Sequence, residues 1–276
     1  MLCYQDNDMK IKAKLRQSEA SDGLHKWSFM VLPLKPWPQL YPRAPSLLDV
    51  AASFTFKMQG QLTPFGATTS SFLQVLCRYR HNWSIELRFR PAFLGAIMNT
   101  TGNQPPAMNP KRGQYMMKDI KRMAEYYQVP IQIPQDFMGS IIKKGSLSAM
   151  RFITAVDMTQ PQFLEPVSRE LWMRIWSRDE DITQPESILA AAKEAGLPSE
   201  LAQKLLAMIS TPEVKSRLKE TTEEALEYGA FGMPAVVAHV NGESHLFFGS
   251  DRLELLGNFI GEKWLGPVPA ASKPRL

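Results

Sequence analysis

Two β-rich runs joined by Asn241-Gly242 constrain the fold of this chain more than any other feature. The first run is Ala235-Val-Val-Ala-His-Val240, and the second is Glu243-Ser-His-Leu-Phe-Phe248. An Asn-Gly pair tolerates the positive φ angles of a type I′ turn, which connects adjacent antiparallel strands. The sequence therefore predicts a β-hairpin over residues 235–248.

Met233-Pro234 stands where the chain enters this hairpin. Proline has no backbone donor, so it suits the first position of a strand or an edge strand. Base rates favour an ordinary trans bond here. A cis bond would instead turn the carbonyl and amide of Met233 outward, where an extended peptide could pair with them as a short added strand.

A helix is expected directly after the hairpin, with Ser250 or Asp251 as its cap. Asp251 and Glu254 have the spacing of a capping box. The apolar residues that follow recur on one helical face: Leu253, Leu256, Phe259, Ile260 and Trp264. The unit is thus a strand entered by proline, a hairpin and a closing helix.

The composition is that of a soluble globular protein, with 44% hydrophobic and 21% charged residues among 276. The sequence contains no apolar run of membrane-spanning length. The net charge is +5, and most of the excess lies in residues 1–65. The remainder is nearly balanced, which argues against nucleic acid as a partner.

Cysteine and histidine placement excludes two kinds of chemistry. Cys3 and Cys77 are the two cysteines of the sequence, so a Cys-x-x-Cys dithiol mechanism is excluded. The four histidines show no metal-ligand spacing, and we expect no metal site. His239 and His245 are expected on facing arms of the hairpin, close enough to approach each other as a structural or surface pair.

Before the hairpin, the pattern changes twice along the chain. Residues 1–70 are interrupted by proline and lack periodicity, except for a possible short strand over residues 53–57, and residues 58–66 form a weak strand candidate. Residues 72–79 have a helical apolar face, and Ile85-Glu-Leu-Arg-Phe-Arg90 alternates as a half-buried strand does. Residues 114–221 are helical in pattern, and their aromatic and Met residues are expected mainly in the core, with a few that line a cleft against the thioredoxin-like domain.

Several segments between residues 73 and 264 resemble the kappa-class glutathione transferases, relatives of the bacterial disulfide oxidases. The segments are Leu76-Cys-Arg-Tyr79, Thr101-Gly-Asn-Gln-Pro-Pro106, Lys144-Gly-Ser-Leu-Ser-Ala-Met-Arg-Phe152, Arg169-Glu-Leu-Trp-Met-Arg-Ile-Trp-Ser-Arg178, Phe231-Gly-Met-Pro234 and Phe248-Gly-Ser-Asp-Arg252. The resemblance implies an α/β thioredoxin-like fold with an inserted all-helical domain. The expected division is a divergent, flexible segment 1–70, a thioredoxin-like domain of residues 71–113 and 222–276, and a helical insertion of residues 114–221.

The same resemblance implies a glutathione site. Ser250 and Asp251 match the positions at the γ-glutamyl end, with Asp251 facing the ammonium group. The backbone of Met233, beside Pro234, matches the position that pairs with the cysteinyl unit, and Asn103 matches a loop contact with the glycyl end. Helix capping by Ser250 and Asp251, and an ordinary turn role for Asn103, are the structural alternatives.

The family's catalytic serine has no clear counterpart. In the family it opens a Ser-Pro-Tyr-Ser-Trp type motif and stabilises the thiolate of glutathione. Counting back from Cys77 places Gly66, which has no hydroxyl, at that position. Thr68, Thr69, Ser70 and Ser71 follow; they would cap a helix, or would substitute for the serine if the loop shifted. The catalytic residue is therefore left unassigned.

Three functional interpretations follow. The first is a glutathione transferase that conjugates or reduces electrophiles or peroxides, with glutathione as co-substrate and no other cofactor. The second is a non-catalytic glutathione-binding or interaction protein on the same scaffold. The third is a poorly folded product in which residues 1–70 are an alternative start. The resemblance also implies a homodimer in mitochondria or peroxisomes, with a cytoplasmic location as the alternative, and Pro274-Arg275-Leu276 resembles a degenerate peroxisomal signal.

Overall fold

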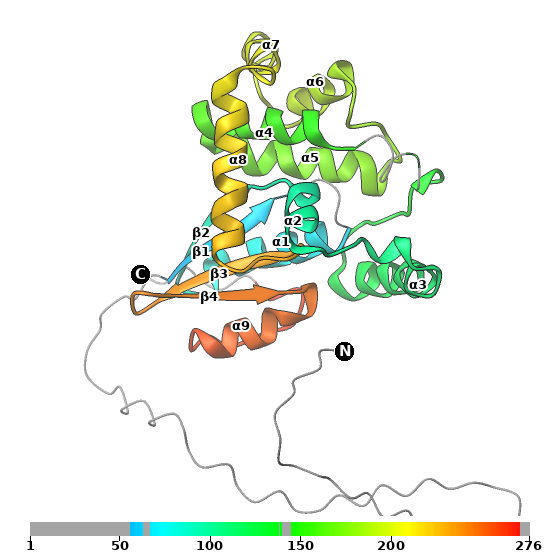
Figure 1. Ribbon diagram of the computed structural model, residues 1–276. Coiled ribbons are helices and arrows are strands. Elements are labelled where there is room, and N and C mark those ends of the chain that lie inside the picture. Colours follow the sequence, from blue (N-terminus) through cyan, green and yellow to red (C-terminus); the bar gives the residue numbers. More distant parts are fainter. Residues whose placement is uncertain (1–55, 63–66, 138, 140–144, 271–276) are drawn as a thin grey trace, which may run out of the picture. The chain divides into compact units, whose positions relative to one another are not determined.

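The computed structural model describes residues 56–62, 67–137, 139 and 145–270. It contains a four-stranded sheet with the strand order β2-β1-β3-β4 (Figure 1). The strands are β1 (Phe56–Leu62), β2 (Ile85–Pro91), β3 (Ala235–Val240) and β4 (Glu243–Phe248). β1 and β2 are parallel, whereas β3 is antiparallel to both β1 and β4.

Strand β1 lies between two partners although its sequence has low strand propensity. It pairs with β2 from Phe56↔Ile85 to Leu62↔Pro91, and with β3 from Lys57↔His239 to Gly60↔Val236. Ladder hydrogen bonds on both edges override the weak local preference. β1 overlaps both the possible strand over residues 53–57 and the weak strand candidate over residues 58–66. β1 and the start of α1 (Ala67–Arg78) precede residue 71, where the sequence analysis placed the beginning of the thioredoxin-like domain. The expected flexibility of residues 1–55 concerns a segment outside the described residues.

The predicted hairpin is confirmed. Asn241 and Gly242 have φ angles of 53° and 86°, and Val240 pairs with Glu243 at the turn. The expected approach of His239 to His245 is wrong, because His239 pairs with Ser244 and His245 with Ala238. Successive residues of a strand point to opposite faces, so this one-residue offset separates the two imidazoles.

Helices cover the sheet and form the insertion. The described α-helices are α1, α2 (Leu94–Thr101), α3 (Pro110–Tyr127), α4 (Leu147–Thr159), α5 (Leu164–Ser177), α6 (Pro185–Glu194), α7 (Ser199–Met208), α8 (Pro212–Glu227) and α9 (Leu253–Phe259). Short 3₁₀ turns are η1 (Tyr79–His81), η2 (Pro106–Met108), η4 (Pro161–Phe163) and η5 (Ser250–Arg252). The elements follow one another in the order that the resemblance implied: strand, helix, strand, helical insertion, hairpin and helix. Within the described residues, no helix has the length and apolar character needed to cross a bilayer.

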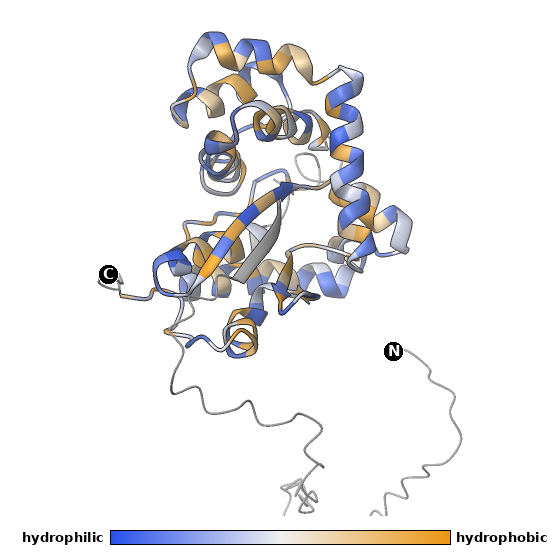
Figure 2. Ribbon diagram, turned by 90° about the vertical axis from the view of Figure 1, so that its left-hand side faces the viewer, coloured by the Kyte–Doolittle hydropathy of each residue, from blue (hydrophilic) through white to orange (hydrophobic). Residues whose placement is uncertain are grey.

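The core lies on both faces of the sheet. Val236 and Ala238 of β3 belong to the main hydrophobic cluster with α1 and α9, whereas Ala235 belongs to a smaller cluster with α2 and α8. Most helices show a hydrophilic and a hydrophobic side in Figure 2, as amphipathic helices do. β3 is a central strand that is buried on both faces of the sheet, and this explains why its sequence is almost continuously apolar.

The closing helix is shorter than expected and is not capped as expected. α9 ends at Phe259, and its N-cap residue, Arg252, makes no side-chain capping bond. The residue that precedes η5 is Gly249, so neither Ser250 nor Asp251 occupies an N-cap position, and their predicted capping role is wrong. After α9, the chain returns along η1, where the hydroxyl of Tyr79 donates to the carbonyl of Gly266 and accepts from the amide of Leu265.

Candidate functional site

The segment that enters the hairpin is held by the loop after α2. The side-chain amide of Asn103 donates a hydrogen bond of 2.7 Å to the carbonyl oxygen of Phe231. A Cβ atom on Gly232 would lie 3.0 Å from the Phe248 ring and 3.2 Å from the Asn103 amide nitrogen. Glycine at position 232 therefore lets these two side chains approach the backbone closely.

The peptide bond between Met233 and Pro234 is cis. Base rates favoured a trans bond at this position, so the structure adopts the cis alternative. The carbonyl oxygen of Pro234 accepts a hydrogen bond of 3.1 Å from the amide of Gly249. This contact joins the start of the hairpin to the turn at its end, which carries Ser250 and Asp251.

Ser250 and Asp251 differ in exposure. Ser250 is 8% exposed, and its hydroxyl lies 3.3 Å from the sulfur of Met123. The side chain of Asp251 is 68% exposed and forms an ion pair of 3.2 Å with Arg252. Gly249, which precedes this turn, has a φ angle of 106°, a conformation that favours glycine.

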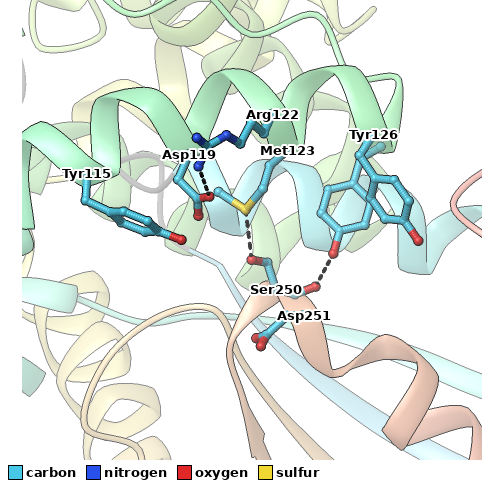
Figure 3. Close-up of a pocket in the computed structure, with 8 residues that line it drawn as sticks. Tyr115, Asp119, Arg122, Met123, Tyr126, Ser250 and Asp251 are labelled. Atoms are coloured by element: carbon cyan, nitrogen blue, oxygen red, sulfur yellow. Dashed lines mark hydrogen bonds and ion pairs between the residues drawn. The ribbon is translucent and has the colours of Figure 1, made fainter. Parts of the chain in front are cut away.

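Helix α3 faces this turn across a cavity of about 530 Å³ (Figure 3). The lining residues that α3 contributes are Tyr115, Asp119, Arg122, Met123, Tyr126 and Tyr127. Ser250 and Asp251 form the opposite side. The volume is within the range that small-molecule sites occupy in proteins.

A second cavity of about 460 Å³ adjoins the first, because Tyr115, Asp119 and Met123 line both. It extends along α3 towards Pro106 and contains the basic residues Lys111 and Arg112. Together, the two cavities offer apolar, aromatic and charged surface along one side of α3. Such a combination suits a ligand with several charged ends and an apolar part.

The charged groups at the first cavity are of both signs. Arg122 and Asp119 form an ion pair of 3.6 Å, and Asp251 is paired with Arg252 at the rim. Burial raises the pKa of Tyr127 to about 12, with smaller contributions from Tyr126 and Asp251. Its hydroxyl is therefore a hydrogen-bond donor at neutral pH, and it donates to the carbonyl oxygen of Ser250.

The five site residues expected from the sequence fall into two neighbouring groups. Ser250 and Asp251 line the cavity beside α3. Asn103, Met233 and Pro234 lie in the contacts around the hairpin entrance, outside the lining of that cavity. The hydrogen bond from Gly249 to Pro234 connects the groups.

Comparison with known proteins identifies the family. The family model described as DSBA-like thioredoxin domain matches residues 70–261. Glutathione S-transferase kappa 1 of Rattus norvegicus is 58% identical over 203 residues, which cover 74% of this chain and 90% of the relative. The human protein of that name is 55% identical over the same shares. The chain belongs to the kappa-class glutathione S-transferase family.

Solved structures support the fold of this kappa-class chain. A 2-hydroxychromene-2-carboxylate isomerase matches with a TM-score of 0.60 and 19% identity, covering 74% of this chain and 94% of the isomerase. A putative protein disulfide isomerase from Nitrosomonas europaea matches with a TM-score of 0.55 and 15% identity, covering 75% and 97%. At such low identity, these likenesses establish the thioredoxin-like fold with a helical insertion and nothing further.

The hydroxyls at the start of α1 are the described groups that would substitute for the kappa-class serine. Thr69, Ser70 and Ser71 are all buried, and the Ser70 hydroxyl accepts a hydrogen bond from Gln74. Gly66 and the side chain of Thr68 lie outside the described part of the chain. Burial, with a contribution from Glu165, raises the pKa of the Cys77 thiol to about 12, so Cys77 is not a nucleophile at neutral pH.

The cavity-lining residues of α3 in this kappa-class chain were not assigned to a site from the sequence. The pattern predicted a helix whose aromatic and Met residues lie mainly in the core, with a few that line a cleft against the thioredoxin-like domain. Tyr115 and Tyr126 are 62% and 56% exposed. Large aromatic residues on the exposed side of an amphipathic helix are a signal that could have identified them. Among the described residues, no group of His, Cys, Asp or Glu side chains could hold a metal ion.

Proposed function

We propose that this chain is a glutathione transferase of the kappa type, which binds glutathione between the hairpin entrance and helix α3. The observation that carries the proposal is the position of Ser250 and Asp251. Both residues line a cavity of about 530 Å³ without capping a helix, in a chain 58% identical to a glutathione S-transferase kappa 1. This position supports a ligand site at the two residues.

In the proposed complex, the γ-glutamyl end of glutathione lies at Ser250 and Asp251. The carboxylate of Asp251 is 68% exposed and can pair with the ligand's ammonium group. The cysteinyl unit extends along the backbone of Met233, beside Pro234, as a short added strand. Asn103, already bonded to the carbonyl of Phe231, is near the glycyl end.

The proposed reaction is attack by the glutathione sulfur on an electrophile. With an aryl halide, the sulfur forms a bond to the ring carbon, the halide leaves with the bonding electrons, and the thiol proton goes to solvent. A donor aimed at the sulfur stabilises the thiolate, and the loss of one such donor costs on the order of a hundredfold in rate. Gly66 supplies no side-chain donor, so we expect binding with slow conjugation.

The test compares the natural chain with Gly66→Ser and with a chimera that carries Ser-Pro-Tyr-Ser-Trp over residues 66–70. Calorimetry measures glutathione binding, and absorbance follows conjugation of 1-chloro-2,4-dinitrobenzene at equal folded concentration. We expect similar affinities and a rate that rises on the order of a hundredfold in the chimera. Absence of glutathione binding in all three proteins would reject the proposal.

A non-catalytic glutathione-binding protein is the second candidate, and Gly66 is the observation that favours it. The two candidates give different results in the same assay. Binding without conjugation in the natural chain, with conjugation in the chimera, supports the binding protein. A natural chain as fast as the chimera supports the enzyme and would place the sulfur donor elsewhere.

A homodimer and a mitochondrial or peroxisomal location complete the proposal, and both rest on the family resemblance. Light scattering after size-exclusion chromatography measures the mass in solution. Microscopy of a tagged protein with its own C-terminus locates it in the cell. If deletion of Leu276 changes nothing and the protein stays in the cytosol, Pro274-Arg275-Leu276 is not a peroxisomal address. These three residues lie outside the described part of the chain.

A further inference from the structure

Arg78, the last residue of α1, donates hydrogen bonds to three backbone carbonyl groups. Its Nη1 donates to the carbonyl oxygen of Tyr127 at 2.7 Å and to that of Pro267 at 2.8 Å, and its Nη2 donates to that of Gln128 at 3.0 Å. Among the described residues, its hydrogen-bond partners do not include a carboxylate. The side chain therefore joins α1 to the end of α3 and to the segment after α9.

The end of α3 is a place where such a donor is needed. The last carbonyl groups of an α-helix have no partner inside the helix, and the helix dipole favours a cation beside them. α3 ends at Tyr127, and its C-cap residue, Gln128, has a φ angle of 49°, in the left-handed region that few residues other than glycine adopt. Arg78 binds the carbonyl groups of both residues. Its guanidinium thus holds the chain at the point where it leaves the helix.

The Arg78 guanidinium keeps its charge in this position. Burial lowers the pKa of Arg78, with a smaller contribution from Arg169. An arginine side chain remains protonated at neutral pH all the same, because its ordinary pKa lies several units higher. Hydrogen bonds from a charged donor are stronger than those between neutral groups. The three carbonyl contacts are therefore a strong restraint on the end of α3.

Tyr127 connects the end of α3 to the cavity proposed for glutathione. Its backbone carbonyl accepts from Arg78, and its hydroxyl donates to the carbonyl oxygen of Ser250 at 2.6 Å. Tyr127 is 6% exposed, and Tyr127 and Ser250 both line the cavity. Arg78 does not line it, so its influence on a ligand passes through neighbouring residues. The shortest connection that the hydrogen bonds provide runs from Arg78 through Tyr127 to Ser250.

We propose that Arg78 is a positioning residue for glutathione binding, because it holds the end of α3 so that Tyr127 keeps the Ser250 turn beside the ligand. The inference rests on the function proposed above and adds to it a residue that lies outside the cavity. Without the guanidinium, the end of α3 loses three charge-assisted hydrogen bonds, and Tyr127 can shift together with Ser250. The cavity then varies in width, and the γ-glutamyl end of glutathione loses part of its contacts.

The test measures glutathione affinity by calorimetry on the full chain, at a temperature well below unfolding. Arg78→Met removes the charge and the donors but keeps an apolar stem, whereas Arg78→Lys keeps the charge and some of the donors. We expect Arg78→Met to weaken binding about tenfold and Arg78→Lys to weaken it several-fold. The same changes are made in a Tyr127→Phe background, where the bond to Ser250 is already absent. There they should change the affinity little.

Two controls separate positioning from a general loss of stability. Arg80→Met breaks an ion pair of 2.5 Å with Glu165, close to the same end of α1. Tyr79→Phe removes two hydrogen bonds to the segment after α9, the segment that Arg78 also contacts. Both variants should unfold at a lower temperature and bind glutathione as the natural chain does. Neither residue makes a hydrogen bond to the end of α3 within the described part of the chain.

Equal glutathione affinity in the natural chain and a folded Arg78→Met would overturn the positioning role. So would an equal weakening with and without Tyr127→Phe, or a weakening of the same size in the two controls. If Arg78→Met fails to fold, the same comparisons with Arg78→Lys decide the matter. A natural chain that does not bind glutathione would reject the proposed function itself, whereas binding that is insensitive to Arg78 rejects the positioning role alone.

Discussion

The phenolic hydroxyl of Tyr127 donates a hydrogen bond of 2.6 Å to the backbone carbonyl oxygen of Ser250. Tyr127 is the last residue of α3, and Ser250 is the first residue of η5. The bond therefore fixes the distance between the two sides of the cavity proposed to bind glutathione. Because the pKa of Tyr127 is about 12, the donor keeps its proton at every pH at which the protein would be assayed.

Tyr127→Phe should lower the free energy of unfolding by about 1 kcal/mol, since one buried hydrogen bond is lost. It should also weaken glutathione binding, because the Ser250 turn is no longer held against α3. Urea denaturation and calorimetry measure the two effects. Tyr126→Phe is the control, since Tyr126 is 56% exposed. An equal loss in both variants would show that the Ser250 contact has no special role.

Asp251→Asn should weaken glutathione binding by about 1–3 kcal/mol, because the charge that pairs with the ligand's ammonium is removed. Calorimetry at low salt measures the change, and circular dichroism checks the fold. Glu254→Gln is the matched control, since Glu254 is exposed on α9 and does not line the cavity. Unchanged affinity in a folded Asp251→Asn would remove Asp251 from the proposed site.

Gly232→Ala should destabilise the chain by about 1–3 kcal/mol through overpacking, because the new Cβ would lie 3.0 Å from the Phe248 ring. It should also displace Asn103, whose amide nitrogen would be 3.2 Å away. Thermal unfolding measures the cost. Gly113→Ala, inside α3, has its nearest contact at 3.5 Å and should be neutral or stabilising, since alanine favours a helix. Similar effects at both positions would contradict the close packing at Gly232.

The Cys77 thiol should resist alkylation up to strongly alkaline pH in the folded chain. Its pKa is raised from 9.0 to about 12, first by burial and then by Glu165, so the folded state retains the proton where the unfolded state has lost it. The resulting stability is present below pH 9 and is lost as the pH rises through 12. Mass spectrometry of the Cys77 peptide after iodoacetamide treatment measures the effect. A rise in folded-state labelling near pH 9, as expected in urea, would contradict it.

Local signals allowed the hairpin and the first helical face to be predicted from the sequence. Asn241-Gly242 determines its own turn, because both residues accept positive φ angles. Strand β1 could not be predicted with the same means, since its stability comes from β2 and β3, which are distant in sequence. The offset of His239 and His245 likewise depends on the exact register.

The candidate site was predicted in part. The expected roles of Ser250 and Asp251 came from a resemblance of motifs, and the structure adds that neither caps α9. The α3 residues that line the cavity were not assigned from the sequence. Helical periodicity indicates which positions are buried and which are exposed, but it does not indicate which exposed positions face another segment. Tyr115 and Arg122 line a cavity only because the turn with Ser250 and Asp251 lies opposite α3.

The pairing of β1 with β3 has a consequence for synthesis of the protein. Lys57 meets His239 in the finished sheet, so β1 leaves the ribosome long before one of its two partners exists. Helices α4 to α8 are made in the interval and can pack with one another by contacts closer in sequence. The nascent chain therefore presents a half-paired strand while the insertion is already forming. Until the hairpin pairs with β1, this unpaired strand edge can bind a chaperone or pair with a strand of another growing chain.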